Sequence, residues 1–270
     1  MKFSICVPVY KTGEYLKNCI DSVTCQDFSD YEIIIVDNGS PDNSGEIADN
    51  IAKDNTKIKV IHQENKGLFH ARITAMNIAK GDYIISLDSD DWLEDGALRI
   101  ISDVIDKYGA DVVIYNNYQC TGKRKRLKIV FDDIILCWDS NSKDEFIRHF
   151  FTNNSLNQIC RKAIKRQLLK TDVLSKMPRI TMTEDWIHSY YPIINARKIV
   201  YIPNALYNYR YNQTSMTKVF DAQVFLSAKI IYGLKNEYIN TYDTSLSLSD
   251  INKQFLIKVS KMLVYEPGRI

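Results

Sequence analysis

The stretch Tyr31-Glu32-Ile33-Ile34-Ile35-Val36-Asp37, followed by Asn38-Gly39-Ser40-Pro41, gives the clearest sign of how this chain folds. Its run of apolar residues leaves no polar face, which is typical of a strand that is buried on both sides of a parallel sheet. The residues after it favour a turn, and an amphipathic pattern begins near Ser44. This unit therefore predicts a strand, a turn and a helix of an α/β protein.

The same alternation extends on both sides of this unit. Strands are predicted at Ser4–Val9, Tyr31–Asp37, Lys57–His62, Asp82–Asp88 and Asp111–Tyr115, and helices near Tyr15–Cys25, Ser44–Asp54, Leu68–Ala79 and Gly96–Tyr108. This order predicts a Rossmann-like, mainly parallel sheet flanked by helices on both faces. Ligands of such sheets bind beyond the carboxyl ends of the strands, so the residues that follow each strand are the candidates for a site.

The regular alternation of strands and helices ends after Tyr115. A β-like run is predicted at Ile129–Cys137, helices near Ser142–Phe151 and Arg161–Leu174, strands at Lys198–Ile202 and Leu206–Tyr211, and a helical segment over Ala222–Ile270. The sequence stops soon after that helical pattern, which is compatible with a chain that continues in a longer protein.

Composition excludes several classes of partner. The 270 residues carry 35 Lys and Arg against 33 Asp and Glu, so a net charge of +2 offers no field that would attract nucleic acid. No window has the roughly 18 apolar residues of a membrane span, and the N-terminal apolar run is too short for a signal peptide. The six cysteines form no C-x-x-C pair. We therefore expect a cytoplasmic protein with reduced thiols.

The strongest candidate site is Asp88-Ser89-Asp90-Asp91, which directly follows an apolar strand. Carboxylates this close repel one another, and a hard divalent cation completed by substrate phosphates and water would relieve that repulsion. The alternative is an acidic turn in which Asp91 or Glu94 lies near a helix N-cap. The place at the carboxyl edge of the sheet favours the cation.

A second polar edge follows the strand that ends at Asp37. Asp42 to Ser44 are explained by turn and cap chemistry, whereas Asp37 and Asn38 lie where a ligand would bind. Neither a G-x-G-x-x-G fingerprint nor a G-x-x-x-x-G-K-[ST] loop is present, which argues against a dinucleotide dehydrogenase and a P-loop nucleotidase.

Several segments together resemble the family 2 glycosyltransferases of GT-A fold. The matching segments are Ser4-Ile5-Cys6-Val7-Pro8-Val9-Tyr10, Val36-Asp37-Asn38-Gly39-Ser40, Asn65-Lys66-Gly67 with Arg72, Lys80-Gly81-Asp82-Tyr83, Asp88-Ser89-Asp90-Asp91, Thr183-Glu184-Asp185-Trp186, Leu206-Tyr207-Asn208-Tyr209-Arg210 and Ser215. The resemblance covers roughly the first 217 residues. It implies a nucleotide-sugar-binding half at residues 1–117, an acceptor-binding half at 118–217 and a helical extension at 218–270.

The resemblance also implies roles for individual residues on the donor side. Asp90 would ligate the Mg²⁺ or Mn²⁺ that bridges the donor diphosphate, and Asp88 would lie near the ribose. The remaining donor-binding candidates are Pro8, Val9, Tyr10, Asp37, Asn38, Lys66, Arg72, Ser89, Arg210 and Ser215. Asn38 departs from the family pattern, in which many relatives carry Asp. Its carbonyl can still accept the N3–H of a pyrimidine, so UDP is expected ahead of GDP, and the choice between UDP and dTDP stays open.

Asp185 aligns with the family's general base, and Glu184 would orient it or bind the acceptor. Direct displacement at the anomeric carbon inverts configuration and needs one carboxylate to take the acceptor's proton. The alternative is that Glu184 and Asp185 only favour the start of a helix running from Trp186 to Ile194. Trp186, next to the expected base, is the best candidate for contact with a sugar acceptor.

The expected function is therefore transfer from a nucleotide-diphosphate sugar to a glycan or lipid-linked saccharide. The alternatives are a sugar-nucleotide pyrophosphorylase and a carbohydrate-binding module that has this fold but no catalytic activity. Lys123–Lys128 and a second basic set could attract an anionic lipid surface and give a peripheral membrane contact. The second set consists of Arg161, Lys162, Lys165 and Arg166. We interpret the two sets as a solvated loop and a solvated helix face.

Overall fold

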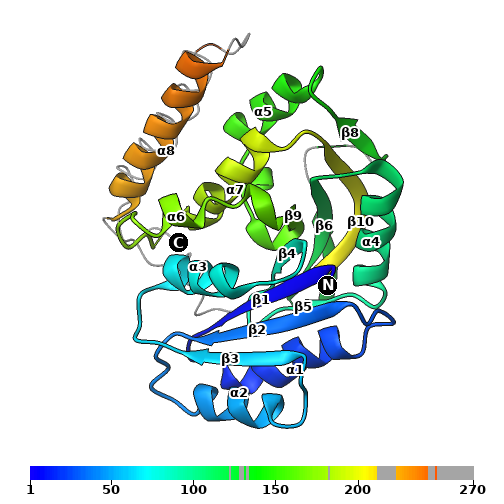
Figure 1. Cartoon of the computed structure of the whole chain (residues 1–270), viewed down its shortest axis with the longest axis vertical. Helices are drawn as coiled ribbons and strands as arrows, with labels where there is room; N and C mark the ends of the chain where they lie inside the picture. The colour runs from blue at the N-terminus through cyan, green and yellow to red at the C-terminus, as the bar shows by residue number, and fades with distance from the viewer. Residues whose placement is uncertain are drawn as a thin grey trace.

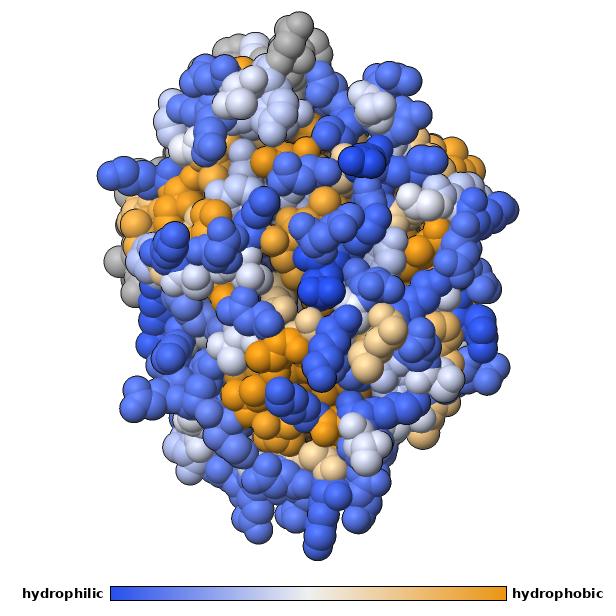
Figure 2. All heavy atoms as spheres, in the orientation of Figure 1, coloured by the Kyte–Doolittle hydropathy of each residue, from blue (hydrophilic) through white to orange (hydrophobic). Residues whose placement is uncertain are grey.

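The computed structural model describes residues 1–121, 123–127, 131, 134–181, 183–211, 223–242 and 247. Most of these residues build a mixed sheet with helices on both faces (Figure 1). Hydrophilic side chains cover the margins of the face shown in Figure 2, and apolar ones gather in patches nearer its centre. Within the described residues, no helix is long and apolar enough to cross a membrane.

One half of the sheet is parallel, as predicted. The strands are β1 (Phe3–Val9), β2 (Tyr31–Asp37), β3 (Ile58–His62) and β4 (Tyr83–Ser86), in the spatial order β3-β2-β1-β4. The arrows of β1, β2 and β3 point the same way in Figure 1. Every residue of β1 is buried, which explains its apolar sequence. The carboxyl ends of these strands therefore meet along one edge.

Two apolar layers enclose the sheet. Helices α1 (Gly13–Thr24), α2 (Ser44–Ala52) and α4 (Ala97–Tyr108) pack on one face. Helices α3 (Leu68–Ile78), α5 (Lys143–Thr152), α7 (Glu184–Asn195) and α8 (Gln223–Thr241) pack on the other. Of the predicted C-terminal helical segment, α8 is confirmed, and most of the remainder lies outside the described residues.

The second half of the sheet contains antiparallel strands. Its members are β5 (Trp92–Leu93), β6 (Val112–Thr121), β7 (Lys123–Leu127), β8 (Leu136–Trp138), β9 (Lys162–Lys165) and β10 (Ile199–Arg210). Strand β9 lies between β4 and β6 and runs antiparallel to both. It joins the two halves into one sheet.

The predicted helix at Arg161–Leu174 is wrong. This stretch forms a 3₁₀ turn (Ile159–Arg161), strand β9, a second 3₁₀ turn (Arg166–Leu168) and the short helix α6 (Thr171–Leu174). The physical reason is tertiary pairing: Ala163 and Ile164 are buried between β4 and β6, which overrides the local pattern.

The interpretation of the basic residues is wrong in the same region. Arg161 is 4% and Lys162 1% exposed, so they do not belong to a solvated face. Arg161 donates to Asn117 Oδ1 at 2.9 Å, and Lys162 Nζ donates to two backbone carbonyl oxygens at 2.6 and 2.7 Å. Residues 123–127 are not a loop either, because they form β7 against β6.

Two other boundaries differ from prediction. The strands predicted at Lys198–Ile202 and Leu206–Tyr211 are one strand, β10, whose register with β6 shifts between Tyr201 and Tyr207. Of the run predicted at Ile129–Cys137, the described part contains β8, while residues 129, 130, 132 and 133 lie outside the described residues.

Candidate active site

The acidic loop after β4 contains carboxylates in three different settings. Asp91 is 1% exposed and accepts hydrogen bonds from the Tyr207 hydroxyl (2.5 Å) and the Arg210 amide (2.7 Å), so it anchors β10. Asp88 accepts from Arg72 Nη2 at 2.7 Å. Asp90 is partly exposed, and burial together with the nearby Asp88 raises its pKa to about 6. Asp90 is therefore the carboxylate of this loop whose oxygens are not bonded to Tyr207, Arg210 or Arg72.

Glu184 and Asp185 form the first turn of α7, as predicted for a base at a helix start. Thr183, which precedes them, has a left-handed backbone with φ of 64°. The side chains of Glu184 and Asp185 are 16% and 24% exposed, so both are accessible from solvent. Burial and Asp185 raise the pKa of Glu184 to about 7. Burial also raises the pKa of Asp185, against the opposing effect of Arg72.

Arg72 lies between these two carboxylate groups. Its Nη1 donates to Asp185 Oδ1 at 2.5 Å, and its Nη2 donates to Asp88 Oδ1. The side chain is 1% exposed, so it offers little surface for the direct nucleotide contact that the sequence predicts. The structure instead brings the acidic loop and the start of α7 to one guanidinium group.

Asp37 ends β2 and is held by its neighbours. Its Oδ1 accepts from the Ser40 amide at 3.0 Å, and its Oδ2 lies 3.1 Å from His62 Nδ1. The opposite nitrogen of His62 lies 3.1 Å from Asp49 Oδ1, and these two carboxylates raise the pKa of the histidine. Burial raises the pKa of Asp37, but the bonds from Ser40 and His62 outweigh it and lower that pKa overall.

The Asn38 amide is turned toward the loop that precedes α3. Its Oδ1 accepts from Gln63 Nε2 at 2.8 Å and from the Lys66 amide at 3.1 Å, and the residue is 4% exposed. The oxygen that was expected to receive a pyrimidine N3–H therefore already has two donors. Asn38 shapes the loop around Lys66, whose side chain is exposed.

Arg210 is held in place by aromatic rings. Its guanidinium carbon lies 4.8 Å from the centre of the Tyr15 ring and 4.7 Å from that of Trp92. Its Nε donates to the Asp90 carbonyl oxygen at 2.8 Å, and its Nη2 to Asn18 Oδ1 at 3.2 Å. This arrangement fixes a positive charge beside the Asp90 backbone, where an anionic group of a donor would need it.

The remaining predicted residues differ in accessibility. Tyr10 is 42% exposed at the end of β1, whereas Val9 is 1% exposed and Pro8 is also buried. Ser89 is 4% exposed, and its hydroxyl lies 2.8 Å from that of Thr12, so its side chain is not open to a ligand. Ser215 lies outside the described residues.

The model of the family described as "Glycosyl transferase family 2" matches residues 4–171. The chain belongs to this glycosyltransferase family.

Individual relatives agree with that match. GlyG, a glycosyltransferase of Streptococcus pneumoniae, is 32% identical over 221 residues, which cover 80% of this chain and 72% of GlyG. EpsH of Bacillus subtilis, provisionally described as a glycosyltransferase, is 32% identical over 235 residues, which cover 85% of this chain and 66% of EpsH. The chain thus spans about two thirds of the length of these relatives.

Solved structures show the same fold. The crystal structure of S. aureus TarS 1-349 in complex with UDP-GlcNAc matches with a TM-score of 0.77 and 20% identity, covering 98% of this chain and 74% of that one. The GT-A architecture expected from the sequence is therefore confirmed.

The carboxylates of the acidic loop fit a hard cation that takes the rest of its ligands from the substrate and from water. Within the described residues, no group of three or more His, Cys, Asp or Glu side chains is arranged to hold a metal. Asp91 and Asp88 use oxygens for Tyr207 and Arg72, whereas the Asp90 carboxylate is half-buried beside like charge. One carboxylate completed by phosphate oxygens and water is a common Mg²⁺ arrangement.

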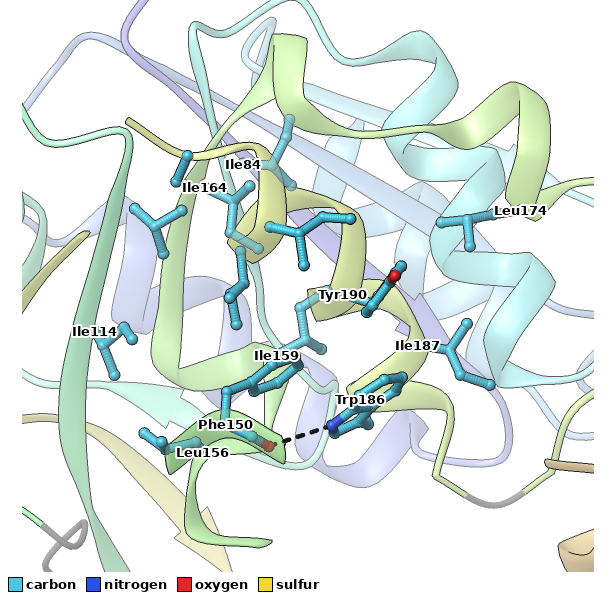
Figure 3. Close-up of a cluster of buried hydrophobic side chains, with 14 of the residues drawn as sticks. Ile84, Ile114, Phe150, Leu156, Ile159, Ile164, Leu174, Trp186, Ile187 and Tyr190 are labelled. Carbon is cyan, nitrogen blue, oxygen red and sulfur yellow. Dashed lines mark hydrogen bonds between the residues drawn. The ribbon is translucent and has the colours of Figure 1, made fainter. Parts of the chain in front are cut away.

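Trp186 does not fit a role in acceptor binding. It is 3% exposed and stacks on Phe150 with ring centres 5.1 Å apart, and its Nε1 donates to the Phe150 carbonyl oxygen at 3.4 Å. Figure 3 shows it among buried apolar side chains, near Tyr190 and Ile187. Trp186 therefore anchors the start of α7, and through it Asp185, in the core.

Sequence reasoning missed three residues that support the glycosyltransferase site. His62 belongs to none of the motifs in the sequence, yet its ring nitrogen lies 3.1 Å from Asp37 Oδ2. Tyr207 belongs to a recognised motif, but nothing in the pattern showed that its hydroxyl would reach Asp91. Lys162 was placed on a solvated face, although it is buried near Asp185.

Proposed function

We propose that this glycosyltransferase moves a sugar from a UDP-sugar to a hydroxyl group of a glycan or lipid-linked saccharide, with inversion at the anomeric carbon. Asp185 is the proposed general base, and Asp90 is the proposed ligand of Mg²⁺ or Mn²⁺ on the donor diphosphate. The observation that carries the proposal is the convergence of Asp88 and Asp185 on Arg72. It brings the proposed base close to the acidic loop, residues 88–91, which is called the donor loop from here on.

The geometry supports a single displacement. Arg72 occupies Asp185 Oδ1, and Oδ2 forms no hydrogen bond within the described part of the chain. Oδ2 is therefore the oxygen that would take the acceptor's proton while the acceptor oxygen bonds to the anomeric carbon. The bond from that carbon to the phosphate oxygen breaks, and its electron pair leaves with UDP. A bound divalent cation would supply charge stabilisation to the departing diphosphate.

The leaving group is also supported by Arg210. Its guanidinium is held between two aromatic rings and bonded to the Asp90 carbonyl, so it loses little rotamer freedom when it binds phosphate. Support for uracil as the base comes from S. aureus TarS, which shares the fold and whose structures include complexes with UDP-GlcNAc and UDP.

The family match favours glycosyl transfer over the pyrophosphorylase and the silent-module alternatives. A silent module would bind sugar without releasing nucleotide, and a pyrophosphorylase would need pyrophosphate or a sugar phosphate as co-substrate. Free glycans and lipid-linked saccharides are both acceptor classes within the proposal.

The test supplies UDP-GlcNAc, UDP-glucose and UDP-galactose as donors and a panel of mono- and oligosaccharides as acceptors, with Mn²⁺, Mg²⁺ or EDTA, and measures released UDP. We expect release with at least one donor and loss of release in EDTA. Where a sugar product forms, NMR of its anomeric proton gives the configuration. Release that persists in EDTA contradicts the metal assignment, and a retained anomeric configuration contradicts single displacement.

A further inference from the structure

Arg72 connects the proposed base to the donor loop. We propose that Arg72 is a positioning residue that fixes the orientation of Asp185 and ties it to Asp88, so that the base and the donor loop share one geometry. This inference rests on the proposed function, because it assumes that Asp185 takes the acceptor's proton.

The bonds of the guanidinium define its orientation. Nη1 lies 2.5 Å from Asp185 Oδ1, Nη2 lies 2.7 Å from Asp88 Oδ1, and Glu184 Oε1 is 3.8 Å from Nη1. Nε is buried and has no hydrogen-bond partner within the described residues. The carboxylates of two separate segments therefore set how the guanidinium lies.

The helix that carries Arg72 is itself fixed. Helix α3 begins after Gly67, whose φ of 83° is readily adopted by glycine. Phe69, Ala71 and Ile73 on this helix are at most 3% exposed, so the core holds the backbone on either side of Arg72. A planar fork on a fixed helix can hold two carboxylates at once, which the point charge of a lysine does less well.

Other charged groups surround Asp185, and they differ from Arg72 in their contacts. Lys162 on β9, with Arg161 and Cys160 before it, contributes from one side, and Asp88 and Glu184 contribute negative charge. Lys162 Nζ donates to the carbonyl oxygens of Leu156 and Gln158, and burial together with Arg161 lowers its pKa to about 7. Within the described residues, Arg72 is the cation that bonds to Asp185.

Loss of Arg72 would release the Asp185 carboxylate from its fixed orientation and remove a nearby positive charge. A base must be deprotonated to act, so its activity rises with pH through its pKa. Because Arg72 opposes the raised pKa of Asp185, its removal moves that rise to higher pH. A residue with a purely structural role would lower the amount of folded enzyme without moving this limb.

The test compares Arg72→Met, Arg72→Lys, Asp185→Asn and the double variant of Arg72→Met with Asp185→Asn. The readout is acceptor-dependent UDP release with Mn²⁺ from the UDP-sugar that the wild-type enzyme uses, as kcat and KM across pH, with folding checked by circular dichroism. We expect Arg72→Met to lower kcat by about 10- to 100-fold, the range for loss of a charge-assisted hydrogen bond. In this variant, the rise of kcat on the acid side of the pH profile (the acid limb) should move to higher pH. Arg72→Lys keeps the charge, so it should recover part of kcat and leave the limb near its wild-type position.

The double variant separates positioning from general damage. If Arg72 acts through Asp185, Arg72→Met costs less than about threefold in kcat once Asp185 is Asn, because the coupled effects do not add. Equal loss in both backgrounds, with an unmoved acid limb, overturns the inference. Should Arg72→Met fail to fold, Arg72→Lys in the two backgrounds gives the same comparison.

The outcomes also distinguish the two proposals. A folded wild-type enzyme that releases no UDP from any of the UDP-sugars tested overturns the proposed function and this inference with it. An active wild-type enzyme with independent Arg72 and Asp185 effects overturns only the role of Arg72.

Discussion

Replacement of Asp185 by asparagine should nearly abolish transfer while leaving donor binding intact. The asparagine oxygen can still accept from Arg72 Nη1 at the place of Asp185 Oδ1, so the bond seen at 2.5 Å has a neutral substitute. The amide nitrogen would take the place of Oδ2 and cannot receive the acceptor's proton. General-base catalysis is worth about 10² to 10⁴ in rate, so kcat should fall by that factor.

Glu184 sets a limit on the size of this effect. Its pKa of about 7 and partial exposure make it a substitute proton acceptor one residue away. The loss in Asp185→Asn is therefore expected at the lower end of the range. The residual activity should rise with pH below 7, because Asp185 no longer raises the pKa of Glu184. Glu184→Gln alone should cost less than Asp185→Asn.

The cost to stability should be modest. Removing one carboxylate leaves the buried Arg72 with Asp88 and the more distant Glu184 as its anionic neighbours. A hydrogen bond to a charged group is worth about 1.5 to 3 kcal/mol, and the asparagine keeps part of it, so about 1 to 2 kcal/mol of unfolding free energy should be lost.

The assay combines steady-state UDP release, calorimetric UDP binding with Mn²⁺ and thermal unfolding. Donor affinity within about twofold of wild type is expected, because the substitution lies on the acceptor side. Transfer by Asp185→Asn at a near wild-type rate would refute the reasoning, and so would a loss of UDP affinity as large as the loss of kcat.

Three further predictions concern the donor side of the site. Asp90→Asn should remove the effect of Mn²⁺ on UDP affinity, because the carboxylate proposed to bind the cation is lost; calorimetry with and without EDTA checks this, and an unchanged metal effect contradicts it. UDP should bind more tightly than GDP in competition, since the proposed donor is a UDP-sugar; tighter GDP binding would rule this out. Tyr207→Phe should lower the free energy of unfolding by about 1.5 to 3 kcal/mol, because it removes the 2.5 Å donor of the buried Asp91. Tyr108→Phe is the control, since its hydroxyl forms no hydrogen bond within the described residues, and an equal effect of both substitutions would show that Asp91 does not depend on this bond.

The parallel half of the fold could be predicted because each of its strands is marked by its own run of apolar residues. Tyr31–Asp37 was predicted with the bounds that the structure shows, since a strand with apolar residues on both faces has few alternatives. The stretch Arg161–Leu174 failed because β9 has four residues, too few to show a period, and its pairing partners lie far away in the sequence.

The candidate site was predictable in position but not in side-chain direction. The pattern predicted that Asp37 and Asp88 follow strands, and the family resemblance singled out Asp185 near a helix start. In the structure, Asp37 ends β2, Asp88 follows β4 and Asp185 lies in the first turn of α7. The sequence does not show that Asn38 would turn its oxygen toward Gln63 and Lys66, or that Arg72 would lie between two carboxylates. Those directions depend on contacts made only after folding.

The place of β9 has a consequence for how the chain assembles. Residues 3–86 contain β1 to β4 and can pair with one another early, since they are close in sequence. The edge of β4 then stays open until residues 162–165 arrive, because β9 is the strand between β4 and β6. Closing so long a loop is slow, and an exposed strand edge invites pairing with other chains. During synthesis, therefore, the first half of the protein should pass through a period when it depends on a chaperone or on low concentration to avoid aggregation.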